Sequence, residues 1–338
     1  MRLRSLQFTV ALLLLAACTR AEHALGWGNE VHRITGLMAQ EMLTPRARIA
    51  VNQLLDGGDL ADASVYMDIY REALKREVPA SERWHYDNRP VCGEPAALGT
   101  YCPEGNCASR QVPRWFNVLA DTSRSKEEQR QALRFLVHIV ADLHQPLHAA
   151  DDNDSGGSAK IMLMPGANAP RNLHLVWDVE LPKISTRGLS ELQVAKDLIA
   201  NHQSKFAEWM GGDAVLWTAQ SHGIARRLAY GKLPGFSCGV LDGKPAGLRD
   251  GKPWTDEPLP LPRDYVEGAT GIIPILVAQA GARIGGLLNA ALDPDGARKA
   301  PAALRSAPPP PPPTASMPAA TSLKDALSRP PAAQVPPK

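Results

Sequence analysis

Apolar residues recur every three or four positions through most of the chain, which is the spacing of a helix with a buried face. The pattern predicts helices over residues 31–43, 131–143, 192–210, 219–230 and 273–292. Strict alternation of apolar and polar residues, which is typical of a half-buried strand, is scarce. We therefore predict an all-α fold.

The intervals between these helices are rich in Gly, Pro, Asn and Asp, which indicates loops over residues 87–113, 151–171 and 232–262. The composition changes abruptly after residue 293, where a run of prolines at residues 308–313 is flanked by Ala and Ser. Such a stretch cannot build a packed core. The expected organisation is a single mainly helical domain, residues 27–293, followed by an extended or disordered tail, residues 294–338.

The first residues, 1–26, predict export. Arg2 and Arg4 precede a short apolar run and small residues, which is the pattern of a secretory signal peptide, and no later stretch reaches the length of a membrane span. We expect a secreted or periplasmic protein with no transmembrane segment. Two cleavage sites are open: one before Trp27, and one in LAAC, which resembles a lipobox and would leave a lipid anchor on Cys18.

Four cysteines beyond the leader predict two disulfides in an oxidising compartment: Cys92, Cys102, Cys107 and Cys238. Their spacing leaves three pairings open, of which a short Cys102–Cys107 loop with a long-range Cys92–Cys238 bridge is the simplest. A cysteine zinc site is the other interpretation, but the spacings match no zinc-finger pattern.

The net charge of the chain does not indicate a class of binding partner. The chain has 37 Lys and Arg against 35 Asp and Glu, so its formal net charge is +2. A balance so close to neutral gives no general attraction to nucleic acid or to a membrane surface. Binding of a polyanion would have to come from a local site.

Residues 138–148, HIVADLHQPLH, place ionisable groups in an otherwise apolar helical stretch. His138 and Asp142 are one helical turn apart and point from one face to the same spot. An isolated buried carboxylate is costly, and a divalent cation would offset that cost. Pro146 bends or ends the helix, which lets His148 turn toward the same site. His144 lies on another face, where we expect it to support the site from behind or to face solvent.

Similar residues recur elsewhere in the chain. His174 and Asp178 repeat the same spacing in NLHLVWD, while His85 lies in WHYDNRP, Asp68 in ASVYMDIYR and His32 in WGNEVH. A lone helical histidine is usually a hydrogen-bonded structural residue, and a single His-x-x-x-Asp pair is common by chance. The joint pattern favours metal, because His and Asp without thiolates form the ligand set of catalytic zinc.

The segments WGNEVH, ASVYMD, WHY, HIVADLHQPLH, GGS and NLHLVWD come in the order and approximate spacing of the S1/P1 nuclease family. The chain resembles that family over about residues 27–292. The resemblance implies a mainly helical domain with the fold shared by zinc-dependent phospholipase C. It also implies a zinc-dependent enzyme that hydrolyses single-stranded DNA and RNA to 5′-mononucleotides and acts on 3′-nucleotides. We expect it to be a monomer.

By this resemblance the site holds three Zn²⁺. The first would be bound by Asp68, His85, His138 and Asp142, and the second by His148, His174 and Asp178. The third would be held by His32, by Asp142 as a bridge, and by the α-amino nitrogen and carbonyl oxygen of Trp27. Only a chain that begins at Trp27 has that amine, which favours cleavage there over acylation of Cys18. His23, His202 and His222 match no metal position.

The resemblance also implies roles around the metals. By that implication a zinc-bound hydroxide would attack phosphorus in line, and the third zinc would stabilise the departing 3′-oxygen. Asp68 would align the attacking water, and Arg71 would clamp the phosphate, with a surface salt bridge as its plainer alternative. Tyr86 corresponds to an aromatic platform for an unpaired base. Asn88 stands where fungal members have an acidic residue that binds the base edge, which predicts a different or looser base preference.

Two other functions remain open on the sequence alone. A zinc-dependent phospholipase C has a similar fold, but its last metal pair ends in Glu, whereas HLVWD ends in Asp. The lipobox and the proline-rich tail are also compatible with a non-catalytic zinc-binding envelope lipoprotein. Such a protein would need neither Arg71 beside the metals nor an aromatic residue beside His85.

Overall fold

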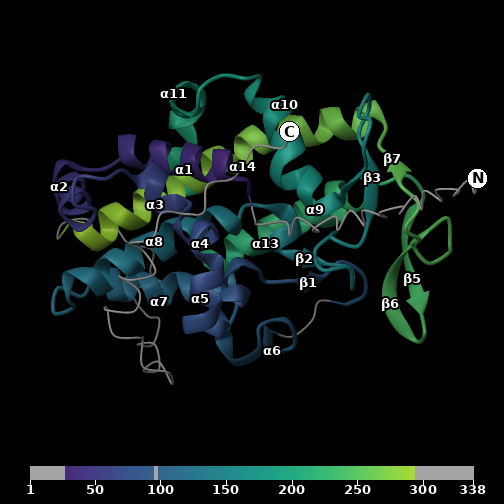
Figure 1. Cartoon of the computed structure of the whole chain (residues 1–338), viewed down its shortest axis with the longest axis horizontal. Helices are drawn as coiled ribbons and strands as arrows, with labels where there is room; N and C mark the ends of the chain where they lie inside the picture. The colour runs from purple at the N-terminus through teal and green to yellow at the C-terminus, as the bar shows by residue number, and fades with distance from the viewer. Residues whose placement is uncertain (1–26, 95–97, 294–338) are drawn as a thin grey trace, which may run out of the picture.

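The structure, a computed structural model, describes residues 27–94 and 98–293. The predicted leader and tail, residues 1–26 and 294–338, lie outside these residues. The described part is mostly helical, as predicted (Figure 1). Its helices are α1 (Asn29–Glu41), α2 (Pro45–Leu54), α3 (Leu60–Ser64), α4 (Tyr66–Ile69), α5 (Arg71–Glu77), α6 (Leu98–Tyr101), α7 (Ala108–Ala120), α8 (Lys126–Asp142), α9 (Leu173–Leu175), α10 (Leu181–Thr186), α11 (Glu191–His202), α12 (Phe206–Trp209), α13 (Ala214–Ile224) and α14 (Arg263–Leu292).

Helix α8 lies among α7, α3 and α14 and carries the most buried stretch of the fold. It begins at a capping box in which Ser125 and Glu128 satisfy each other's backbone N–H groups. From Phe135 to Asp142 every side chain is buried, because neighbouring helices cover all faces of this part of the helix. The helix ends at Asp142, and Pro146 begins a separate 3₁₀ turn, Pro146–His148, as expected from the proline.

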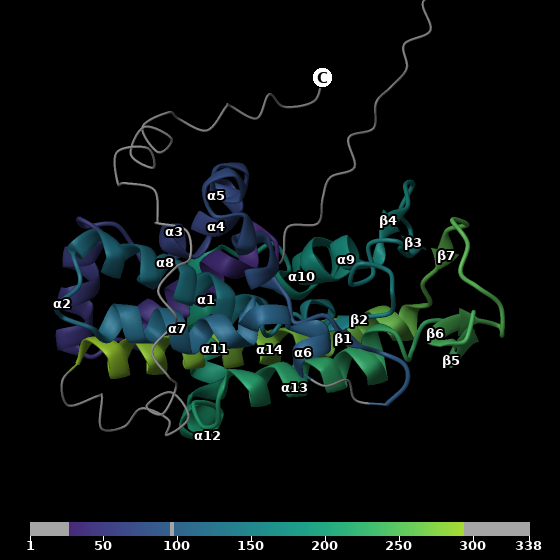
Figure 2. The same cartoon turned by 90° about the horizontal axis from the view of Figure 1, so that it is seen from below.

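Helix α14 runs along most of the domain, above α13 and α12 in the view of Figure 2. Within the described residues it is the one helix long and apolar enough to cross a membrane, but 67% of its apolar window is buried inside the protein. It packs against α1, which in turn contacts α3. Gly36 permits that second contact, since a Cβ at this position would lie 2.4 Å from the carbonyl oxygen of Leu60.

Short strands gather beside the helices, most of them at one end of the molecule (Figure 1). They are β1 (Arg89–Pro90), β2 (Ala150–Asp151), β3 (Ile161–Leu163), β4 (Arg171–Asn172), β5 (Phe236–Leu241), β6 (Lys244–Arg249) and β7 (Leu259–Pro260). Strands β1 and β2 pair in parallel, β3 lies between β4 and β7, and β5 and β6 form an antiparallel hairpin. The β1–β2 pair holds the segment after His85 against the segment after His148.

Some predicted boundaries are wrong. Residues 232–262, predicted as a loop, contain the β5–β6 hairpin, whose turn uses Asp242 and Gly243, both with positive φ. Asp-Gly is a strong hairpin signal that the loop interpretation missed. The predicted loop 87–113 likewise includes the start of α7, which tolerates Pro113 in its interior. The predicted helix 192–210 is divided into α11 and α12 by a 3₁₀ turn.

The disulfide prediction is confirmed in its simplest pairing. Cys92 bonds Cys238 and Cys102 bonds Cys107. The long-range bridge ties the β5–β6 hairpin to the segment that follows β1. The bridge therefore joins the hairpin to the β1–β2 pair, whose strands follow His85 and His148 in the chain.

Candidate metal centre

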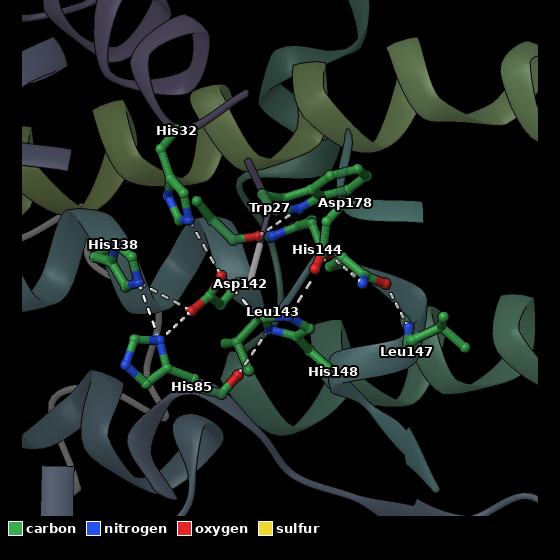
Figure 3. Close-up of polar contacts among 12 residues, drawn as sticks. Trp27, His32, His85, His138, Asp142, Leu143, His144, Leu147, His148 and Asp178 are labelled. Atoms are coloured by element: carbon green, nitrogen blue, oxygen red, sulfur yellow. Dashed lines mark hydrogen bonds and ion pairs between the residues drawn. The ribbon is translucent and has the colours of Figure 1, made fainter. Parts of the chain in front are cut away.

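The end of α8 brings three side chains into direct contact (Figure 3). His138 Nε2 lies 3.1 Å from Asp142 Oδ2, as their spacing of one helical turn predicts. His85, from the end of the 3₁₀ segment Pro79–His85, places its Nδ1 2.8 Å from the same carboxylate oxygen and 3.0 Å from His138 Nε2. None of the three is more than 2% exposed.

Two further residues complete this group. His32, on α1, stacks its ring on that of His138 with centroids 4.0 Å apart, and its Nε2 lies 3.3 Å from Asp142 Oδ1. Asp68, on α4, has one oxygen 3.7 Å from His138 Nε2 and the other 3.8 Å from His32 Nε2. Residues from four separate segments thus converge on the carboxyl end of α8.

A second group lies beside the first. His174 Nε2 is 3.2 Å from Asp178 Oδ2, and His148 Nε2 is 3.9 Å from Asp178 Oδ1. Asp178 belongs to a π-helical turn, Val176–Glu180, that continues α9, a local form often found at functional sites. The two groups adjoin, since His148 Nδ1 is 3.4 Å from Asp142 Oδ1.

Backbone carbonyls fix the orientation of three imidazoles. The Nδ1 atoms of His138, His148 and His174 donate to the carbonyl oxygens of Ser64, His85 and Gly156, at 2.7, 2.9 and 2.6 Å. A carbonyl can only accept, so these contacts place the proton on Nδ1 and turn each Nε2 lone pair toward the acidic groups. This is the arrangement by which metal-binding imidazoles are usually held.

The two groups contain many buried polar atoms without a hydrogen-bond partner. Among the described residues these include both nitrogens of His32, both oxygens of Asp68, Asp142 Oδ1, His148 Nε2, His174 Nε2 and Asp178 Oδ2. Each such atom costs free energy unless something binds it. Residues of the two groups form three sets whose ligand atoms lie within 4.8 Å of one another: His32, His138 and Asp142; Asp68, His85 and His138; and His148, His174 and Asp178. Imidazole nitrogens and carboxylate oxygens at these spacings fit zinc.

Several side chains of the centre have pKa values far from their usual values. Burial lowers the pKa of His32 and His85 to about 4, so both rings are neutral, which is the form that binds metal. Burial raises the pKa of Asp68 to about 7. Burial would also lower the pKa of His138, but the carboxylates of Asp142 and Asp68 outweigh it and raise that pKa to about 9. A bound cation would replace this proton as the charge that balances the two carboxylates.

The first described residue is anchored at the same place. The indole of Trp27 is fully buried and its Nε1 donates to the carbonyl oxygen of Ala141 at 3.1 Å. The next residue, Gly28, donates its N–H to the carbonyl oxygen of Asp178 at 2.9 Å. The indole of Trp27 thus contacts the residue before Asp142, and the residue after Trp27 contacts Asp178 (Figure 3).

Arg71 and Tyr86 lie next to the first group. Burial raises the pKa of Tyr86 to about 12, although the nearby Arg71 guanidinium opposes that shift. Arg71 Nη1 is buried without a hydrogen-bond partner, while the Arg71 guanidinium also interacts with the hydroxyl of Tyr86. The ring of Tyr86 packs 4.7 Å from that of His148. Asn88 is exposed, has a φ of 48°, and its N–H donates to the carbonyl oxygen of His148 at 3.3 Å.

The remaining histidines have other contacts. His144 is buried, so the structure excludes the solvent-facing alternative: its Nδ1 donates to Val140, and its Nε2 accepts from Arg283 at 2.6 Å. His222 donates to the carbonyl oxygen of Pro90, and His202 packs against Trp209. His23 lies outside the described residues. Sequence reasoning assigned no role to the residues that hydrogen-bond to the histidines and to Asp178, which are Ser64, Gln145, Gly156 and Arg283.

The chain resembles known nucleases over the described part. The S1/P1 Nuclease family model matches residues 27–293. Nuclease S1 from Aspergillus oryzae is 29% identical over 246 residues, which is 65% of this chain and 80% of that protein. Nuclease P1 from Penicillium citrinum is 28% identical over 202 residues, 56% of this chain and 73% of its own length. Endonuclease 2 from Arabidopsis thaliana is 30% identical over 167 residues, covering 45% and 55% of the two chains.

Proposed function

Because the chain belongs to the S1/P1 nuclease family, we propose that it is a phosphodiesterase that hydrolyses single-stranded DNA and RNA to 5′-mononucleotides and removes phosphate from 3′-nucleotides. The family is zinc-dependent, and its members act on nucleic acids. The observation that carries the proposal is the set of partnerless buried nitrogens and carboxylate oxygens that face one another at the end of α8.

The proposed metal content is three Zn²⁺. Asp68, His85, His138 and Asp142 would hold one, and His148, His174 and Asp178 another. The third would lie between His32, Asp142, and the α-amino nitrogen and carbonyl oxygen of Trp27. The anchored indole of Trp27 supports this last set, because it holds the start of the matched region beside Asp142. We accordingly propose that the mature protein begins at Trp27.

The residues of the chain would divide the remaining tasks. Bound zinc would supply an activated water near neutral pH and positive charge for the phosphate oxygens. Asp68 has two partnerless oxygens, one of which would accept a hydrogen bond from the attacking water and align it with phosphorus. Arg71 would donate its free Nη1 hydrogens to a non-bridging phosphate oxygen. The half-buried ring of Tyr86 would stack on an unpaired base, with Asn88 at its edge.

Replacing Arg71 by alanine is expected to lower kcat/KM by about 10- to 100-fold, because a hydrogen bond to a charged group contributes roughly 1.5–3 kcal/mol. The measurement is steady-state hydrolysis of a 3′-nucleotide. Arg76→Ala provides the matched control, since Arg76 is exposed on the same helix, α5. Equal rates for both variants and the wild type would show that Arg71 does not contact the phosphate.

A substrate panel tests the function itself. Purified protein would be incubated with single-stranded DNA, RNA, 3′-AMP and phosphatidylcholine, each with and without a chelator. The proposal predicts chelator-sensitive release of 5′-mononucleotides from both polymers and of phosphate from 3′-AMP. Hydrolysis of phosphatidylcholine alone would indicate a phospholipase C, and no hydrolysis at all would indicate a zinc-binding protein.

We also propose that the protein is exported and acts as a monomer. The two disulfides support export, since such bonds persist in oxidising compartments.

A further inference from the structure

We propose that Gln145 is a positioning residue of the metal centre. Its side-chain amide joins the turn that carries His148 to the carboxylate of Asp178, and it fixes which oxygen of Asp178 faces the metal. This inference rests on the proposed zinc centre. It concerns a residue that is not itself a ligand and that neither the spacing of the histidines nor that of the aspartates identifies.

Gln145 is fully buried and uses both ends of its amide. Its Nε2 donates to Asp178 Oδ1 at 2.6 Å, across 33 positions of sequence. Its Oε1 accepts from the backbone N–H of Leu147 at 2.5 Å, as the cap of the 3₁₀ turn Pro146–His148. Its own carbonyl oxygen accepts from the N–H of His148 at 3.0 Å.

These contacts determine the direction of the amide. The N–H of Leu147 can only donate, so the atom of Gln145 that faces it must be the oxygen. The NH₂ group is consequently directed at Asp178. A glutamine is the one standard side chain of this length that can accept at one end and donate at the other without carrying a charge.

The consequence for Asp178 is a division between its two oxygens. Oδ1 receives the amide hydrogen bond, whereas Oδ2 is buried, has no hydrogen-bond partner and lies 3.2 Å from His174 Nε2. Asp178 would therefore offer Oδ2 to the metal as a single ligand atom. Since the same amide caps the turn that ends in His148, one residue sets the position of two of the three proposed ligands of this zinc.

Two substitutions separate the contacts. Gln145→Met removes both hydrogen bonds at similar volume. Gln145→Glu keeps an acceptor for Leu147 but places a carboxylate oxygen against Asp178. The control is Gln131→Met, because Gln131 is a buried glutamine on α8 that belongs to neither group of ligands.

The readout is zinc content after dialysis against increasing concentrations of a chelator, together with a thermal melt of each metal-free protein. Both Gln145 variants are expected to release one zinc at about 10- to 100-fold weaker affinity, the usual effect of removing a group that orients a ligand. Wild type and Gln131→Met should retain all zinc under the same conditions. The metal-free Gln145→Glu protein is expected to melt below the metal-free wild type, because a second carboxyl group is buried beside Asp178, but to remain folded at the temperature of the dialysis.

Three results would overturn the inference. Unchanged zinc affinity in both Gln145 variants would show that the amide does not position the ligands. An effect confined to Gln145→Met would mean that the residue acts through the turn alone. A wild-type protein that binds no zinc would refute the proposed function and this inference with it. The first two results, in contrast, would refute the role of Gln145 and leave the proposed zinc centre intact.

Discussion

Replacing Asp142 by asparagine is expected to lower kcat at least about a thousandfold, which corresponds to roughly 4 kcal/mol of lost transition-state stabilisation. Asp142 is fully buried and lies within 3.4 Å of an imidazole nitrogen of each of four histidines: His32, His85, His138 and His148. Asparagine keeps the volume but removes the negative charge, and its NH₂ group would face imidazole nitrogens that are needed for metal.

Steady-state hydrolysis of 3′-AMP and circular dichroism provide the measurement. The matched control is Asp87→Asn, because Asp87 is also buried and accepts from the N–H of Ser109, but belongs to neither ligand group. An asparagine oxygen can retain that contact, so near-normal activity is expected of the control. If Asp142→Asn kept more than a tenth of wild-type activity with native helical content, the bridging role of Asp142 would be wrong.

Removal of the metal is the second large effect. Exhaustive chelation is expected to abolish hydrolysis and to lower the melting temperature, because the partnerless atoms of His32, Asp68 and Asp178 lose the ion that satisfies them. Activity and melting temperature would be followed through stripping and stepwise return of zinc.

The choice of metal provides the control for this experiment. Zinc should restore activity, whereas magnesium at the same concentration should not, since imidazole-rich sites suit zinc and magnesium prefers oxygen ligands. Recovery with magnesium alone would contradict the proposed ligand set. A melting temperature that does not respond to zinc would indicate that the ions do not stabilise the fold.

Sequence alone predicts the local parts of the centre. His138 and Asp142 fall on one face of α8 because their spacing matches the helical period, and the structure places them 3.1 Å apart. His174 and Asp178 are likewise 3.2 Å apart, even though the segment between them passes from α9 into a π-helical turn. Periodicity carries this information because it needs only a few consecutive residues.

The spacing of residues within short segments does not predict which distant segments meet at the centre. His32, Asp68 and His85 reach α8 through helix contacts that depend on packing, such as the close approach of α1 and α3 at Gly36. The family resemblance, and not the spacing, predicted that they meet. His144 hydrogen-bonds to Arg283, 139 positions away, and no helical period relates the two residues. The Gln145–Asp178 hydrogen bond is equally non-local.

The most direct test of the account is elemental analysis of purified active protein, with the metal content referred to the fraction of molecules that turn over substrate. We expect three zinc atoms per active molecule. Full activity in protein that holds far fewer than three would contradict it.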